Sequence, residues 1–494
     1  MAKKIVARDI KGGHPVDMTS STDMYYAQVG NKLLKEALGC RMSWSLSPTD
    51  LHDVVVKVVL YFEDIICDGG LWRAFVNKHQ ELYGKPLPFY DVEGEYLADE
   101  PHVEDIRLLI WDALAGQNLG EIIHPEEDVI MDLADAFYEV LEAEFENAPI
   151  NEDMKRYYEE AAFMDDFIRM RVTLQWLFAN CYITRHELNE DYFIEYNTSL
   201  AKMFKMDEED DRAIYASTNQ VIFKAKIGML ALLPQEWLAM LMEANGNSHH
   251  AETLRAIEFR DYQVYLLDDY DDEAMRIRSM DDEILSIRLD GFGHLNTDTL
   301  KDTEGCIGSF VRFKGEWNPN GMTSWGQYGK SFKEGKEQRA RYRSGFSEKN
   351  LKKIMKKTGG SPLVYLHDGE EVRHFLMDGI GIPKHLMQPS KLDNEKEIVA
   401  WVPNCDDGPF FSFGCTSAIC DPRNPFYVKD EKGEDSLELV VNPELSEDTM
   451  ARYLIEHGML PDASFDDHRG KERGRQLAQE NLDFIARSFR RNYY

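Results

Sequence analysis

Apolar residues in the first half of the chain recur at helical spacing, and this pattern constrains the fold more than any other feature. Between Leu51 and Ile66 they follow one another at intervals of three and four, which places them on one buried helix face. The preceding Ser47-Pro48-Thr49-Asp50 offers a capping hydroxyl and a proline at the first helical position. Similar spacing continues, so we predict a mainly helical region from about Tyr25 to Met242.

The period changes between Phe259 and Trp325. Short apolar runs there are separated by acidic turns and lie at 262–267, 274–278, 284–289, 307–313 and around Trp317. Short strands at regular spacing predict a small antiparallel β-sheet or five-stranded barrel. Beyond residue 360, strand-like and helix-like segments alternate, which predicts a mixed α+β region.

The predicted fold class is therefore α+β, with a large mainly helical N-terminal part. We divide the chain into four segments: an acidic helical domain (20–256), a small β domain (257–328), a basic helical connector (329–360) and an α+β C-terminal domain (361–494).

Net charge and cysteine content restrict the compartment and the class of partner. The 494 residues include 56 Lys and Arg against 89 Asp and Glu, a net charge of −33. A surface of this charge repels polyanions, which disfavours a general nucleic-acid coat or a peripheral membrane protein. Seven cysteines, an odd number in a large chain, indicate reduced thiols, and we find no apolar run of secretory or transmembrane length. We expect a cytoplasmic protein that does not act at a membrane.

One basic segment interrupts the acidic chain. Residues 330–357 hold eleven basic and three acidic side chains, whereas the flanking parts carry net charges of −31 and −10. The candidate nucleic-acid-binding residues are Lys330, Lys333, Lys336, Arg339, Arg341, Tyr342, Arg343, Lys349, Lys352, Lys353, Lys356 and Lys357. Phe332, Tyr342 and Phe346 lie among them, so phosphates could be neutralised while aromatic rings stack on unpaired bases.

The same segment has a purely structural interpretation. Ser347 is positioned to cap a helix whose Leu351, Ile354 and Met355 form a buried stripe, with Phe346 packing on Leu351. The lysines then fall on the solvent side. Such a face could dock on an acidic partner, or on the acidic N-terminal region of the same chain.

A second candidate surface follows a predicted helix end. Tyr83, Pro86, Pro88, Phe89 and Tyr90 form a stiff, extended and partly apolar ledge. It could bind a peptide or another partner. The alternative is a cover packed over neighbouring helices.

Motifs for catalysis or metal binding are weak. Glu63-Asp64 with His79 could form an acid/base pair or supply metal ligands, and Cys405, Cys415 and Cys420 could bind zinc, although they lack a C-x2-C pair. We find no Gly-x-Ser-x-Gly elbow and no complete dinucleotide fingerprint. We therefore assign no catalytic residue, no metal site and no cofactor.

Several aromatic and proline-rich stretches resemble a known family. They are Tyr61-Phe-Glu-Asp64, Trp72-x-x-Phe75, His79, 82–90, Asn424-Pro-Phe-Tyr427 and the ending 481–494. Together they resemble an uncharacterised bacterial family, of the kind found in gut anaerobes, that carries a domain of unknown function. The resemblance extends from about Tyr25 to the end of the chain and implies a cytosolic bacterial protein without an assigned reaction.

The sequence thus favours a non-enzymatic interaction or regulatory protein, with an acidic body and one basic strip suited to selective electrostatic association. A protein partner is expected but not identified. Nucleic-acid binding through residues 330–357 is the alternative. An enzyme whose site assembles from scattered residues is the third.

Overall fold

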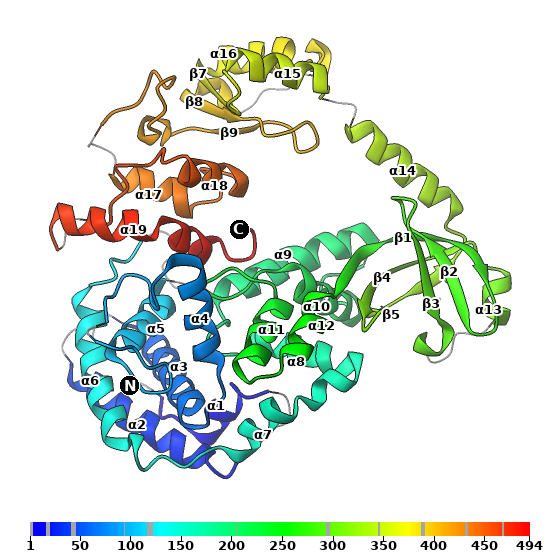
Figure 1. Cartoon of the computed structure of the whole chain (residues 1–494). Helices are drawn as coiled ribbons and strands as arrows, with labels where there is room; N and C mark the ends of the chain where they lie inside the picture. The colour runs from blue at the N-terminus through cyan, green and yellow to red at the C-terminus, as the bar shows by residue number, and fades with distance from the viewer. Residues whose placement is uncertain are drawn as a thin grey trace. The chain divides into compact units, whose positions relative to one another are not determined.

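The structure is a computed structural model of the whole chain (Figure 1). It describes residues 3–15, 20–40, 46–92, 94–115, 122–204, 206–292, 297–343, 346–386, 391–429, 433–466 and 469–494. Two compact units are formed, the first by Met1–Gln327 with Arg487–Tyr493, and the second by Tyr328–Ala486 with Tyr494. Each unit is described separately below.

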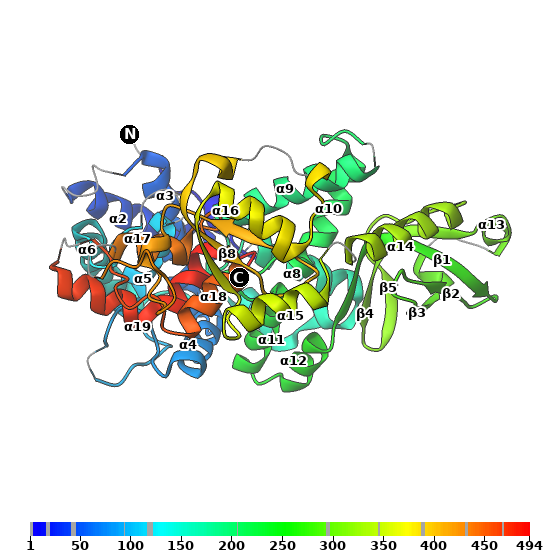
Figure 2. The same ribbon diagram turned by 90° about the horizontal axis from the view of Figure 1, so that it is seen from above.

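The first unit begins with a helical array. Its helices are α1 (Ala7–Lys11), α2 (Asp23–Gly39), α3 (Pro48–Ile66), α4 (Leu71–Tyr83), α5 (Val103–Ala115), α6 (Asp128–Phe145), α7 (Glu152–Glu160), α8 (Phe167–Ala179), α9 (Glu187–Phe204), α10 (Asp211–Lys224), α11 (Pro234–Ala244) and α12 (Ser248–Arg255). Helix α3 packs against α1, α2, α4 and α5 (Figures 1 and 2). Its second half is buried on every side, from Val58 to Ile65. A polar group in that half of α3 is therefore withdrawn from water.

The predicted start of α3 is confirmed. Ser47 Oγ accepts a hydrogen bond from the Asp50 amide at 3.2 Å, and the Asp50 carboxylate accepts one from the Ser47 amide at 3.2 Å. This reciprocal capping box satisfies two backbone donors at the helix start.

A five-stranded barrel completes the first unit. Its strands are β1 (Glu258–Tyr270), β2 (Ala274–Arg278), β3 (Ile284–Arg288), β4 (Gly305–Phe313) and β5 (Glu316–Pro319), with the short α13 (Thr297–Lys301) between β3 and β4. The order β1-β2-β3-β5-β4 closes on itself because β1 also pairs with β4, and β6 (Ser324–Gly326) extends the sheet at β4. The β3–β5 pairing is parallel and the others are antiparallel. This is the strand order of the OB-fold, an architecture that alone does not establish a ligand.

The second unit combines a small sheet with helices. Its elements are α14 (Gly329–Arg343), α15 (Glu348–Lys357), β7 (Leu363–Asp368), α16 (Gly369–His374), β8 (Lys396–Trp401), β9 (Phe410–Ser412), α17 (Gly433–Val441), α18 (Asp448–Glu456) and α19 (Lys471–Arg490), whose last residues belong to the first unit. The antiparallel sheet has the order β7-β8-β9. Ile354 of α15, Val372 of α16 and Ile398 of β8 share one core cluster.

The α+β fold class is confirmed, with helices dominating and two small sheets. Among the described helices, none combines the length and apolar character that crossing a bilayer requires.

Candidate functional site

The predicted basic strip is divided between two helices. Lys330, Lys333 and Lys336 lie on α14, and Lys349, Lys352, Lys353, Lys356 and Lys357 lie on α15. The backbone of Arg339, Arg341, Tyr342 and Arg343 continues α14, but their side chains lie outside the described part of the structure. The face of α15 is therefore the part of the strip whose chemistry can be described in full.

Helix α15 is amphipathic, with one face in the core and the other in solvent. Its start is capped by Ser347, whose Oγ accepts a hydrogen bond from the Asn350 amide at 3.3 Å. Ile354 is only 4% exposed and packs in the cluster of the small sheet. All five lysines are exposed. One of them, Lys352, forms an ion pair with Glu348 at 3.6 Å; the other four form no ion pair within the described residues.

The aromatic part of the nucleic-acid hypothesis is wrong for two of its three rings. Phe332 and Phe346 are each 4% exposed, so their faces cannot stack on bases. Phe346 belongs to the core cluster that also holds Ile354, as the structural alternative predicted. On α14, Lys336 lies over the Phe332 ring at 5.8 Å and Lys330 pairs with Glu334 at 3.7 Å. The side chain of the third ring, Tyr342, lies outside the described residues, so the hypothesis retains this ring and the phosphate contacts of the exposed lysines.

The proline-rich ledge is largely a cover. Pro88, Phe89 and Tyr90 are buried, whereas Tyr83 and Pro86 are half-buried. The Phe89 ring packs against Trp111 with centroids 4.8 Å apart, and Tyr90 donates a hydrogen bond to the Pro125 carbonyl at 2.6 Å. Because these side chains already fill the helical core, the geometry favours the covering role that the sequence left open.

The sequence pair Glu63-Asp64 does not act together with His79. Asp64 lies in the last turn of α3, and its carboxylate accepts hydrogen bonds from the Trp72 amide at the start of α4 at 2.8 Å and from Tyr182 at 2.9 Å. Burial raises the pKa of Asp64 to about 6 despite these donors. His79 forms a hydrogen bond with the Lys85 carbonyl at 2.7 Å, and burial lowers its pKa to about 4. These groups have structural roles at the two ends of α4.

A pocket beside Asp64 is small. It has room for about one water molecule, and its lining includes Asp68, Trp72 and Arg73. Pockets for small molecules typically measure about 300–1,000 Å³. This hollow does not support the enzyme hypothesis.

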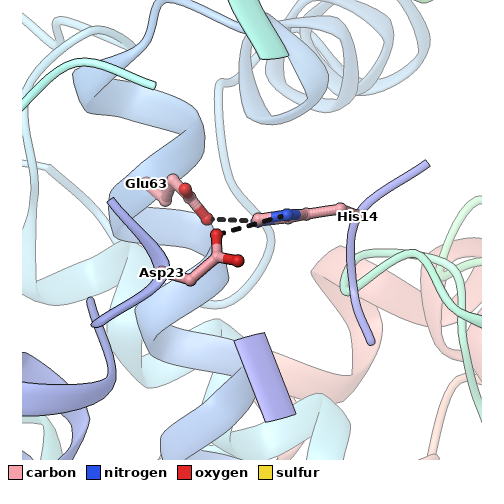
Figure 3. A group of neighbouring side chains, drawn as sticks. All are labelled: His14, Asp23 and Glu63. Carbon is pink, nitrogen blue, oxygen red and sulfur yellow. Dashed lines mark hydrogen bonds and ion pairs between the residues drawn. The ribbon is translucent and has the colours of Figure 1, made fainter. Parts of the chain in front are cut away.

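Glu63 faces two residues that the sequence analysis did not connect with it. His14, from the segment after α1, and Asp23, the first residue of α2, point toward Glu63 of α3 (Figure 3). His14 Nε2 donates a hydrogen bond to Glu63 Oε2 at 2.8 Å, and Asn151 donates to Glu63 Oε1 at 2.7 Å. His14 Nδ1 and Asp23 Oδ1 are 3.8 Å apart. One ligand atom from each of the three residues lies within 4.8 Å of the others.

This cluster is withdrawn from solvent and negatively charged overall. The side chains of His14, Asp23 and Glu63 are 0%, 6% and 1% exposed. Burial alone would lower the pKa of His14, but the hydrogen bond and charge of Glu63 outweigh it, so the pKa is raised. Burial, reinforced by the charge of Glu63, raises the pKa of Asp23. Of the described residues, no other set of three His, Cys, Asp or Glu is grouped tightly enough to hold a metal ion, so Cys405, Cys415 and Cys420 do not form such a set.

Helix α5 buries two more carboxylates two turns apart. Asp112 is paired with both Lys57 and Arg491, whose charges hold its pKa well below the usual range even though burial opposes this. Among the described residues, Asp105 has no such cation. It accepts hydrogen bonds from Tyr61 at 2.5 Å and Tyr96 at 2.8 Å, and burial raises its pKa to about 8. One helix face thus holds one firmly ionised carboxyl group and one that is protonated at neutral pH.

The sequence contains only a partial signal for the buried cluster. Glu63 is an acid within a stretch that is apolar on all sides, which indicates a buried polar group in need of partners. Nothing local identifies His14 as that partner, because it lies 49 residues away in a short segment between glycines and a proline.

Comparison with protein families settles the resemblance. Residues 4–281 and 334–491 match the family described as protein of unknown function (DUF3843). The chain belongs to this family. No curated protein and no solved structure matches the chain. The predicted membership of a family of unknown function is confirmed, and the bacterial source stays a prediction.

The DUF3843 match includes both candidate regions described above. His14, Asp23 and Glu63 lie in its first segment, and α15 lies in its second. Residues 282–333, which include most of the barrel after β2, fall between the two segments. The family assignment brings no reaction with it, so function is argued from the sites alone.

Proposed function

We propose that this DUF3843 protein is a non-enzymatic interaction protein of the cytoplasm, which binds an acidic partner protein through the lysine face of α15. The observation that carries this proposal is the set of four exposed lysines without an ion pair among the described residues: Lys349, Lys353, Lys356 and Lys357. In a chain of net charge −33, such a face is an exception that concentrates positive potential at one place.

The anchoring of α15 supports a preformed binding surface. The Ser347 cap and the buried Ile354 fix the helix backbone, so that binding has to order only the lysine side chains. Charge complementarity of this kind mainly accelerates association and selects partners.

An acidic protein fits better than a nucleic acid. Burial of Phe332 and Phe346 removes two of the three rings on which bases were predicted to stack. A long polyanion would also come close to acidic parts of this chain and be repelled by them, whereas a compact acidic patch on a protein can bind α15 alone.

The test uses a triple charge reversal, K352E/K353E/K356E, and labelled probes of defined chemistry. The probes are a glutamate-rich peptide, a single-stranded oligonucleotide and a duplex, each measured by fluorescence anisotropy from about 20 to about 150 mM salt. We expect the peptide to bind at low salt, and we expect the reversal to weaken its binding at least tenfold.

A matched control carries the same change in charge elsewhere. Lys35, Lys202 and Lys301 are exposed lysines of the first unit, and K35E/K202E/K301E should weaken peptide binding far less. Equal losses in the two triple variants would reduce the effect to net charge and overturn the proposal. Binding of oligonucleotides without the peptide would establish the nucleic-acid alternative, and binding of no probe at low salt would refute both.

A further inference from the structure

We propose that His14, Asp23 and Glu63 bind one divalent transition-metal cation, with Zn²⁺ as the best fit, and that this ion fastens the N-terminal segment to α2 and α3. The site is independent of the lysine face of α15.

The donor chemistry favours such an ion. One imidazole and two carboxylates form a mixed nitrogen and oxygen set, which suits Zn²⁺ and similar cations better than Mg²⁺ or Ca²⁺, whose ligands are oxygen atoms. The three side chains come from three separate segments and converge on one point (Figure 3). Their ligand atoms lie within 4.8 Å of one another, and a single ion with bonds of about 2.0–2.2 Å can reach all three after small side-chain rotations.

Two unpartnered atoms point to a missing ligand. His14 Nδ1 and Asp23 Oδ1 are buried and have no hydrogen-bond partner in the described part of the structure. Their separation of 3.8 Å is too long for a hydrogen bond. An ion bound through His14 Nε2 and Glu63 Oε2, in place of their hydrogen bond, would also give Asp23 Oδ1 a partner, whereas His14 Nδ1 lies on the other edge of the ring. Buried polar groups are otherwise almost always paired.

The charge balance leads to the same conclusion. With His14 protonated, the two carboxylates leave one uncompensated negative charge in a buried site, which is costly. The exposed Lys11 acts on His14 and Asp23 but is not a member of the cluster. A divalent cation with neutral His14 brings the charge of the site to zero.

The position of the site defines its role. The ligands are closed off from solvent, as in structural rather than catalytic zinc sites. His14 follows α1 directly, whereas Asp23 begins α2 and Glu63 lies in the last turn of α3. The ion would therefore hold residues 3–15 against the helical core.

The test measures Zn²⁺ binding to the full chain after chelator treatment, by calorimetry and by the visible spectrum of added Co²⁺. We expect one ion per chain and a rise in Tm on loading. The near-isosteric variants D23N and E63Q should bind at least about 10-fold more weakly. D64N, which changes the adjacent buried acid outside the cluster, should bind like the wild type.

Hydrogen exchange on the wild-type chain keeps the proposal testable if a variant fails to fold. Added Zn²⁺ should slow amide exchange in residues 3–15 and at the start of α2, while α15 remains unchanged. The proposal is overturned if the stripped protein binds no Zn²⁺ at micromolar concentration. It is also overturned if D23N and E63Q bind as tightly as the wild type, or if protection appears only away from the N-terminal segment.

Discussion

We expect Asp105 to lower the stability of the protein as the pH rises from 6 to 9, and the substitution Asp105→Asn should remove this contribution. Burial raises the pKa of this carboxyl group in the folded chain to about 8, against about 3.8 in an unfolded chain. The folded state therefore holds a proton over this window that the unfolded state has already lost. Stability contributed by a raised pKa is complete below the unfolded value and is lost as the pH rises through the folded value.

The magnitude follows from the linkage between pKa and free energy. Each pH unit between the two pKa values changes the free energy of unfolding by about 1.4 kcal/mol for one proton. Between pH 6 and pH 9 the folded Asp105 releases nearly one proton, so the wild type should lose about 2.5 kcal/mol relative to the variant. At pH 6 the variant is less stable by about 1–2 kcal/mol, because an amide offers only one acceptor to the hydroxyl groups of Tyr61 and Tyr96. The order of stability should therefore reverse between about pH 7 and pH 7.5.

The assay is urea unfolding of both proteins at pH 6, 7, 8 and 9, followed by tryptophan fluorescence. The difference between wild type and variant isolates Asp105, because other titrating groups, such as His14 with its raised pKa, contribute to both curves. A difference that stays constant within about 0.5 kcal/mol over this range would refute the assignment of a protonated, buried Asp105.

Two further substitutions test local features of the fold. Asp112→Asn should lower the free energy of unfolding of the first unit by about 3–5 kcal/mol, measured in urea, because Lys57 and Arg491 lose a buried counter-charge. Because the pKa of Asp112 is lowered in the folded chain, this loss should stay constant between pH 6 and 9 and become smaller only in acid. Ser47→Ala should lower the free energy of unfolding by about 1 kcal/mol through loss of the α3 cap, whereas Ser47→Asp, which keeps an acceptor for the Asp50 amide, should preserve most of it in the same measurement.

Much of the fold was predictable because its signals are local. The Ser47 cap with the proline after it fixed the start of α3, and alternating residues between acidic turns located β2 and β3 within a residue of their observed ends. The short β9 was missed because three residues are too few for a periodic pattern. Within the region predicted to be mixed α+β, α16 continues as a wider helical turn over Phe375–Ile380, a change in hydrogen bonding that has no composition signal.

The candidate sites were less predictable because they depend on partners distant in sequence. The lysine face of α15 could be derived from spacing alone, since one helix contains it. The partner of Asp112 lies 379 residues further along the chain, and no local rule connects the two. A sequence can indicate that a carboxyl group inside an apolar helix needs a partner, whereas only the fold identifies that partner.

A comparison of the buried acids shows why one group of them calls for a metal ion. Helices α3 and α5 bury four carboxylates: Glu63, Asp64, Asp105 and Asp112. Both oxygens of each accept hydrogen bonds or ion pairs, from backbone amides, tyrosines, an asparagine, a histidine or cations. The two side chains that meet at Glu63 each have a buried atom without a hydrogen-bond partner, His14 Nδ1 and Asp23 Oδ1, which lie 3.8 Å apart. Protein groups therefore compensate Asp64 and Asp112, and protonation compensates Asp105, whereas at Glu63 a cation would satisfy Asp23 Oδ1 and the net charge together.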